Sequence, residues 1–147
     1  MSNETNGWDS VENVESQSDY LTLEDGKNKL RIMTVPVTGW ERWVDGQPER
    51  VRGGKTDAPG SDWSFIWVVS AYDYAAEAPK IWAIHQSTIR GALMGLKDDA
   101  SWGDPTSYDI TVTRSGSGLN TTYQVTPNPK EEFPAFIDPV AVDSIFN

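Results

Sequence analysis

The chain has 147 residues, with 22 acidic and 12 basic side chains, one histidine and no cysteine. This length favours a single domain with its own core, and the missing cysteines exclude disulfides and thiolate metal sites. The charge is uneven: residues 1–25 hold seven acids and no base, residues 131–147 hold four acids and no base, and residues 26–130 hold every base. We therefore expect an acidic disordered tail over 1–18, a folded domain over 19–130 and an acidic C-terminal tail over 131–147.

The first predicted strand covers residues 27–37, within which Lys27, Lys29 and Arg31 alternate with Leu30 and Ile32. In a strand, alternate side chains share a face, so three bases lie on one side and the two apolar residues face the core. Three bases without an acid on one face favour phosphate contact over a merely solvated surface.

Residues 39–62 are rich in glycine, proline and charge, which predicts a long loop. A loop of this length inside a compact domain is usually functional or disordered. It contains aromatic and basic residues together, which we interpret as candidate ligand contacts: Trp40, Arg42, Trp43, Arg50, Arg52 and Lys55.

Residues 63–72 (WSFIWVVSAY) are β-branched and aromatic and predict a second strand. Trp63, Phe65 and Trp67 share one face of it, while Ile66 and Val68 share the other. If Ile66 and Val68 point into the core, three aromatic rings line a groove. The opposite assignment of the two faces is left open by the sequence.

The remaining elements follow in order. Residues 80–85 predict a short strand, residues 87–98 a helix from apolar residues three and four apart, and residues 107–114 and 121–126 a hairpin. Five strands with a helix between the third and fourth is the order of an OB-fold, a small Greek-key barrel. The sequence therefore predicts an all-β domain with one short helix.

Basic groups that follow phosphates and aromatic faces on which bases stack are the two requirements of a non-specific single-strand binder. The bases of the first strand, the aromatic residues of the loop and second strand, and Arg114 in the hairpin meet both requirements. The chain has no GxxxxGK[ST], HExxH or GxSxG motif, and we interpret its single histidine, His85, as structural. We expect neither an enzyme nor a bound cofactor or metal.

From Tyr20 to Pro129 the chain also resembles the single-stranded DNA-binding proteins encoded by tailed phages. The similar segments are GKNKLRI, GWERW, WSFIWVVSAYDY, IHQSTIRGALMGL and WGDPTSYDITVTRSGSGLNTTYQVTPNP. The resemblance implies an OB-fold that coats and protects single-stranded DNA during phage replication and recombination. It also implies that the acidic C-terminal tail recruits replication proteins, although here Phe146 is followed by Asn147 instead of ending the chain.

Two other classes of function remain open from the sequence. One is a carbohydrate-binding β-module that uses exposed tryptophans. Its affinity for sugars would not depend on salt concentration. The other is a nuclease that uses His85 or paired acids.

The N-terminus has no basic segment followed by an apolar run, and no apolar stretch approaches the ~20 residues that span a bilayer, so we expect a cytoplasmic protein without a membrane partner. If the acidic tail competes with DNA for a basic groove, deleting residues 131–147 should tighten DNA binding.

Overall fold

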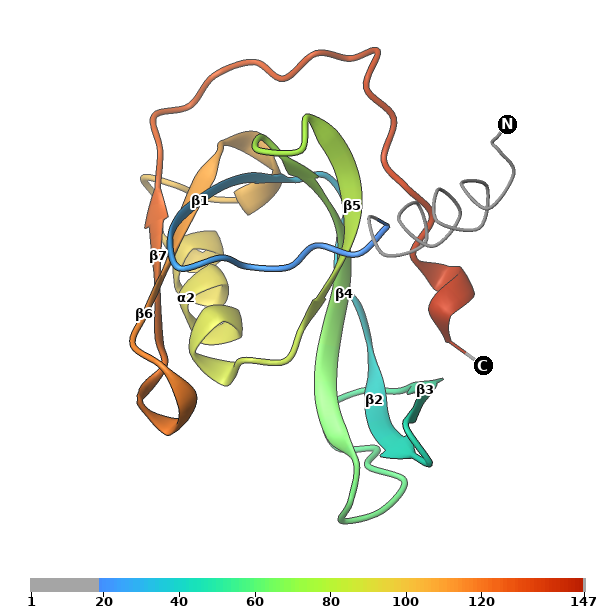
Figure 1. The fold of residues 1–147 in the computed structure, drawn as a ribbon. Coiled ribbons are helices and arrows are strands. Elements are labelled where there is room, and N and C mark those ends of the chain that lie inside the picture. The colour runs from blue at the N-terminus through green and yellow to red at the C-terminus, as the bar shows by residue number, and fades with distance from the viewer. Residues whose placement is uncertain (1–18, 147) are drawn as a thin grey trace, which may run out of the picture.

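The computed structural model describes residues 19–146, and within them the chain is mostly β-structure with one α-helix (Figure 1). The acidic tail expected over residues 1–18 lies outside this range. The elements are, in chain order, β1 (Gly26–Ile32), β2 (Val37–Val44), β3 (Gln47–Arg52), β4 (Ser64–Asp73), β5 (Ala78–Ile84), α2 (Ser87–Asp98), β6 (Ile110–Ser115) and β7 (Thr122–Pro127). Three single-turn 3₁₀ helices are η1 (Pro105–Ser107), η2 (Gly118–Asn120) and η3 (Asp143–Ile145).

The seven strands form one antiparallel sheet in the order β3-β2-β4-β1-β6-β7, and β5 pairs with β4. One edge of β4 pairs with β2 along its first half and with β1 along its second half. Within residues 19–146, β5 and β7 do not pair, so the sheet stays open between them. The expected count of five strands is therefore wrong, and the helix follows the fifth strand of the chain instead of the third.

The two additional strands come from the segment that was predicted to be a loop. Residues 37–52 form the β2–β3 hairpin, in which Trp40 pairs with Val51 and Arg42 with Glu49. Its two-residue turn is Asp45-Gly46, and both residues have positive φ, at 53° and 77°. Such a turn matches the twist of a hairpin, and Asp-Gly is one of its preferred sequences.

The main core lies between α2 and the side of the sheet that carries Val69, Trp82 and Ile84. Leu30 and Ile32 of β1 belong to it, as predicted from the alternation of β1. So does the ring of Tyr108, which is fully buried and donates its hydroxyl to the carbonyl oxygen of Gly103. The apolar face of α2 supplies Ile89 and Leu93, which explains why a helix with two glycines forms here.

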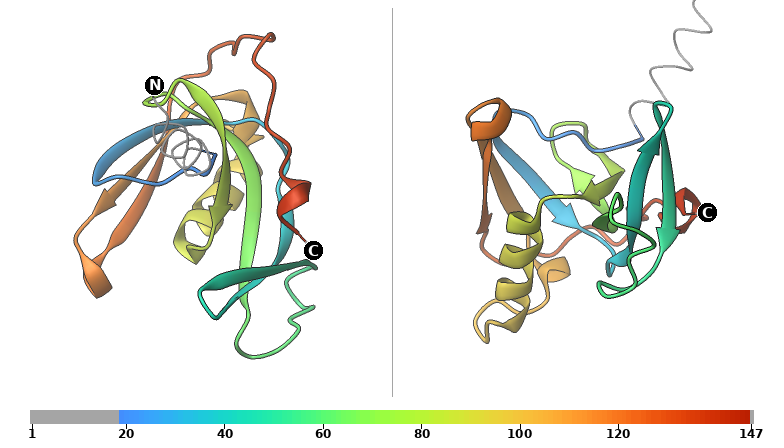
Figure 2. Two further views of the ribbon diagram at one scale, coloured as in Figure 1. Left: turned by 45° about the vertical axis from the view of Figure 1, so that its right-hand side comes forward. Right: turned by 90° about the horizontal axis from the view of Figure 1, so that it is seen from below.

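A second apolar cluster lies on the other side of β4, where Ile66 and Val68 are completely buried. The C-terminal residues cover them. Figures 1 and 2 show the chain leaving β7, crossing one end of the sheet and descending along β4 to η3. Val142 packs in this cluster, and the backbone N–H of Val140 donates to Ser70 Oγ at 3.0 Å. The segment over residues 131–146 is therefore part of the folded body.

At the opposite end of the described chain, residues 19–23 run alongside β5. The N–H of Leu21 donates to the carbonyl of Ile81, and the N–H of Ile81 donates to that of Asp19, each at 2.8 Å. Leu21 and Leu23 pack against the main core. This segment occupies the open side of the sheet beside β5. No helix within residues 19–146 has the length and apolar character needed to cross a membrane.

Candidate nucleic-acid interface

A cleft of about 360 Å³ lies between the β2–β3 hairpin, the 19–23 segment, the end of β5 and the β6–β7 hairpin. Figure 1 shows the two hairpins extending toward the same end of the molecule, on either side of the link from β5 to α2. We call this space the hairpin cleft. Its lining residues are Tyr20, Leu21, Thr22, Leu23, Glu41, Trp43, Arg50, Trp82, Ala83, His85, Gln86, Arg114 and Tyr123.

Three aromatic side chains of the hairpin cleft, besides the buried Trp82, come from separate parts of the chain. Trp43, near the tip of the β2–β3 hairpin, is 64% exposed, and Tyr20 is 38% exposed. Tyr123 comes from β7, where it is the pairing partner of Arg114 in β6. An indole that remains mostly in water next to a cleft is available to stack on a planar ligand.

Two arginines provide positive charge in the same cleft. Arg50 Nε donates to Glu41 Oε2 at 2.7 Å, and its guanidinium lies 5.8 Å from the ring centre of Tyr20. Arg114 Nη1 donates to the carbonyl of Leu23 at 3.1 Å. Arg114 Nε is buried without a hydrogen-bond partner within the described chain, as is Gln86 Oε1. Buried polar atoms usually have partners, so these two atoms leave hydrogen-bonding capacity beside the cleft unused.

Glu41 connects the basic groups at the base of the cleft. Its carboxylate is only 4% exposed and accepts from Arg50 and also contacts His85 Nε2, at 2.6 Å. Burial opposes ionisation of Glu41, but the contacts with His85 and Arg50 outweigh it and hold the pKa of the carboxyl below its ordinary value. Glu41 therefore stays ionised and fixes the position of Arg50.

Of the predicted contact residues, the structure brings Trp43, Arg50 and Arg114 together in this cleft. Sequence reasoning missed Tyr20, His85 and Tyr123. The predicted hairpin contained a signal for Tyr123, since pairing its two strands places Tyr123 opposite Arg114. No local pattern places Tyr20 here, because its position depends on a contact with the distant β5.

The three basic residues of β1 differ in their exposure and in their partners. Arg31 is 4% exposed, and its Nε donates to Asp109 Oδ1 at 2.7 Å. Its Nη2 donates to the carbonyl of Glu131, which belongs to the C-terminal segment. Lys29 is half exposed and lies 3.7 Å from the same Asp109, while Lys27 is exposed. Arg31 is therefore inaccessible to a ligand and, unlike Arg50, does not line the hairpin cleft.

The basic face of β1 also does not adjoin the aromatic face of β4. Arg31 pairs with Tyr72, so it shares the side of the sheet that carries Ile66 and Val68. Trp67 faces the other side, where it packs against the main core. The arrangement in which Ile66 and Val68 enter the main core is therefore wrong, because they are buried beneath the C-terminal segment.

The other predicted residues lie outside the hairpin cleft. Trp40 is 9% exposed, with its ring 5.1 Å from Phe65, and Trp63 lies under the guanidinium of Arg42 at 4.6 Å. Arg42 also contacts Glu49 and Asp62, and Arg52 contacts Asp143 at 2.6 Å. Lys55, Phe65 and Trp67 line a separate hollow beside α2. Within residues 19–146, no three acidic or histidine side chains are grouped so that they could hold a metal ion.

Comparison of the chain with protein-family models, with curated proteins and with solved structures finds no match.

Proposed function

We propose that this protein binds single-stranded DNA without sequence specificity, through the hairpin cleft. The observation that carries the proposal is the meeting of Trp43, Tyr20 and Tyr123 with Arg50 and Arg114 in one cleft. Bases of any identity can stack on aromatic faces, and arginine guanidinium groups donate hydrogen bonds to phosphate oxygens. A protein with such a cleft coats and protects exposed strands, the role expected in phage replication and recombination, and works without catalysis.

The strand order supports an OB-fold as the architecture behind this cleft. If β1 and β2 are taken as one strand bent at residues 33–36, then β4, β5, α2, β6 and β7 follow in OB-fold order. The pairs β1–β4, β4–β5, β1–β6 and β6–β7 agree with that fold, and the open side between β5 and β7 corresponds to its partly open barrel. OB-folds bind oligonucleotides on strands two and three and on the loops from strand one to two and from four to five. The hairpin cleft lies between the equivalents of those two loops.

The test is a titration of the full chain with oligo-dT, followed by tryptophan fluorescence at several salt concentrations. Stacking on Trp43 should quench its fluorescence. Two phosphate contacts, by Arg50 and Arg114, predict a log–log salt slope of about −1.4. Absence of quenching and of any mobility shift at low salt would refute the proposal. Quenching by oligosaccharides that does not depend on salt would assign the cleft to a carbohydrate-binding module instead.

Two pairs of variants locate the interface. Trp43→Ala should weaken binding by about 1–3 kcal/mol, whereas Val44→Ala, next to it on the opposite face of β2, should not change binding. Arg114→Gln should reduce the magnitude of the salt slope by about 0.7, the contribution of one phosphate contact. Lys27→Gln is its control, because Lys27 is exposed on β1 outside the cleft. If Lys27→Gln lowers the slope and Arg114→Gln does not, the strand follows β1 and the cleft is not the interface.

A further inference from the structure

Two hollows that share no lining residue with the hairpin cleft adjoin each other beside α2. One is an apolar cavity of about 280 Å³ between the link from β1 to β2, β4, α2 and η1, which we call the α2 cavity. The other is a space of about 460 Å³ lined by Lys55, Phe65 and Arg90, which we call the basic hollow. Thr38, Trp67 and Met94 line both. A ligand can therefore lie in both hollows at once.

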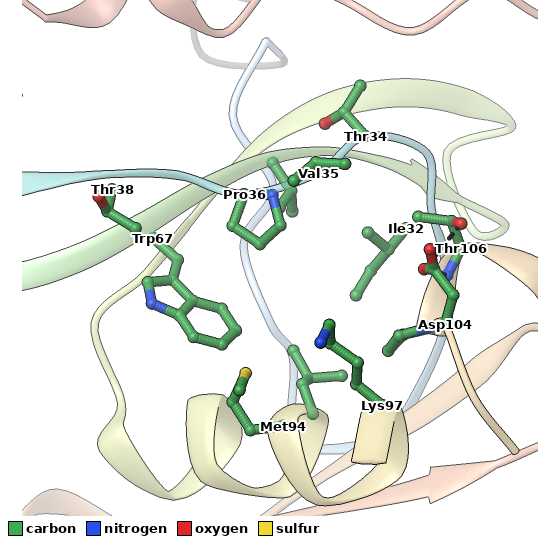
Figure 3. Close-up of a pocket in the computed structure, with 13 residues that line it drawn as sticks. Ile32, Thr34, Val35, Pro36, Thr38, Trp67, Met94, Lys97, Asp104 and Thr106 are labelled. Atoms are coloured by element: carbon green, nitrogen blue, oxygen red, sulfur yellow. Dashed lines mark hydrogen bonds between the residues drawn. The ribbon is translucent and has the colours of Figure 1, made fainter. Parts of the chain in front are cut away.

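The end of the α2 cavity that adjoins the basic hollow is apolar and aromatic. Figure 3 shows the indole of Trp67 beside Pro36 and Met94 at this end, and Lys97 and Asp104 farther from the indole. Lys97 and Asp104 carry opposite charges, so the far end of the cavity does not favour an anion. The near end suits an uncharged planar ring that packs against the indole.

The basic hollow has no acid among its lining residues. Arg90 Nη1 donates to three carbonyl oxygens at 2.8–3.2 Å, those of Phe65, Ile84 and His85. Within residues 19–146 its hydrogen bonds leave from Nη1 alone, so the N–H groups on Nε and Nη2 are left for a ligand. Burial holds the pKa of Arg90 below its ordinary value, and no carboxylate of the described chain opposes that effect. An anion beside Arg90 would supply the missing counter-charge.

Lys55 adds a second positive charge at the rim of the basic hollow. It is exposed and forms no ion pair within the described chain. The loop before it is fixed, because Trp40 Nε1 donates to the carbonyl of Gly54 and the N–H of Gly54 donates to Asp57 Oδ2, each at 2.9 Å. Asp57 is used in this way and does not line the hollow. The basic hollow is therefore complementary in charge to a phosphate.

The hairpin cleft and the basic hollow meet at the link from β5 to α2. His85 and Gln86 line the cleft, and Ser87, the next residue, lines the hollow. Consecutive Cα atoms are only ~3.8 Å apart. A strand that leaves the cleft across this link therefore enters the basic hollow.

We propose that one nucleotide of a single strand bound in the hairpin cleft occupies these two hollows. Its phosphate lies against Lys55 and Arg90, and its base lies against Trp67 in the α2 cavity. This inference rests on the proposed function, because the same strand fills the hairpin cleft. It extends the binding site around the β5–α2 link and adds one phosphate contact to the two in the cleft.

The first experiment measures the salt slope with oligo-dT of increasing length, from ~4 to ~16 nucleotides, the range of site sizes of OB-folds. Strands that fill only the cleft should give a slope of about −1.4, and longer strands about −2.1. Lys55→Gln should remove this increase of about 0.7 and leave the slope for short strands unchanged. Lys27→Gln is the control, because Lys27 lies outside both hollows. A slope that does not grow with length, or growth that survives in Lys55→Gln, would overturn the inference.

A matched pair of glycine variants blocks the hollow without disturbing the fold. Gly91 lines the basic hollow, Gly95 lies one turn farther along α2 outside both hollows, and an added Cβ meets open space at either position. Glutamate forms helices better than glycine does, so both variants should fold. Gly91→Glu should weaken binding of long strands by about 5- to 150-fold, the contribution of one stacked base. Gly95→Glu, which adds the same charge, should bind as wild type does. Equal weakening by both variants would refute a site in the hollow.

The last experiment separates this inference from the proposed function. A long oligo-dT with 5-bromouracil at a single position is irradiated on the full chain, and the cross-linked residues are identified by mass spectrometry as that position is moved along the strand. We expect cross-links to Trp43 or Tyr123 from some positions and to Trp67 from others. Cross-links to the cleft residues alone would overturn this inference and leave the proposed function standing. Cross-links to Trp67 alone would keep the nucleotide site beside α2 and refute the role of the hairpin cleft.

Discussion

Replacing Asp109 by asparagine tests the conclusion that Arg31 is a structural residue. Both side chains are 5% exposed, and their ion pair is 2.7 Å long. Asparagine keeps the size of the side chain, and its oxygen still accepts from the hydroxyl of Tyr74, which donates to Asp109 at 2.8 Å. The substitution therefore isolates the charge and leaves Arg31 buried without a counter-ion.

Breaking a buried ion pair in this way costs about 3–5 kcal/mol, since the remaining charge loses its partner but stays out of water. In urea unfolding followed by tryptophan fluorescence, a loss of ~4 kcal/mol at a slope of ~2 kcal/mol per M lowers the midpoint by ~2 M. Asp25→Asn is the matched control, because it removes an exposed carboxylate 3.8 Å from Arg114. That change should cost less than about 1 kcal/mol.

A double variant completes the test. Arg31→Met with Asp109→Leu removes both charges, and replacing a buried pair by apolar residues is often neutral or stabilising. This variant should regain wild-type stability and bind oligo-dT with the wild-type salt slope. A loss below ~1 kcal/mol in Asp109→Asn would mean that Arg31 is effectively solvated. A salt slope smaller by about 0.7 in the double variant would show that Arg31 contacts a phosphate.

Three further predictions concern stability. Gly39→Ala should destabilise the fold in urea unfolding, because an added Cβ would collide with the Phe146 ring and the Val51 carbonyl oxygen, and Phe146→Ala in the same chain should relieve only the first collision. Burial and the hydrogen bond to a carboxylate raise the pKa of Tyr74 to about 12. Its contribution to stability is complete below the unfolded value of about 10 and is lost as pH rises toward 12, and Tyr74→Phe should abolish this loss in unfolding curves at several pH values. Deletion of residues 131–147 should lower the urea midpoint, because it uncovers the apolar side of β4, and a truncated protein with unchanged stability would contradict the packing of the C-terminal segment.

Local sequence patterns were sufficient to predict the elements in which apolar residues recur at regular spacing. The helix over residues 87–98 was predicted with the bounds that the structure has, since its apolar residues recur at helical spacing. The alternation in β1 correctly assigned Leu30 and Ile32 to the core. In both cases the side chains that decide the structure are neighbours in sequence.

The β2–β3 hairpin was missed because its strands contain proline, glycine and charged residues that are typical of loops. A signal was nevertheless present: Val44-Asp45-Gly46-Gln47 contains the Asp-Gly pair of a two-residue hairpin turn. Interpreting this pair as a hairpin turn would have placed Trp43 near the tip of a hairpin. The structure has Trp43 exposed at that position.

Sequence patterns could not predict where the acidic and basic segments lie in the fold. Arg31 looked like a surface base, and its burial depends on Asp109, which is 78 positions away. The C-terminal segment looked like a tail because of its charge, but Val140, Val142 and Phe146 pack on β4. Both outcomes depend on long-range contacts that no window of the sequence contains. The Arg52–Asp143 ion pair is a contact of the expected kind between the C-terminal segment and a basic residue.

The segment over residues 19–23 has a consequence for the motion of the hairpin cleft. Two backbone hydrogen bonds with Ile81, one bond from Arg114 and the packing of Leu21 and Leu23 hold this wall. The neighbouring strands β4 and β5, by contrast, pair over seven residues. Segments with few hydrogen bonds open locally at a lower free energy than the sheet to which they attach. The cleft can therefore change its width by releasing one edge while the rest of the sheet stays paired. If the cleft binds single-stranded DNA as proposed, this change of width would let it accommodate bases of different size.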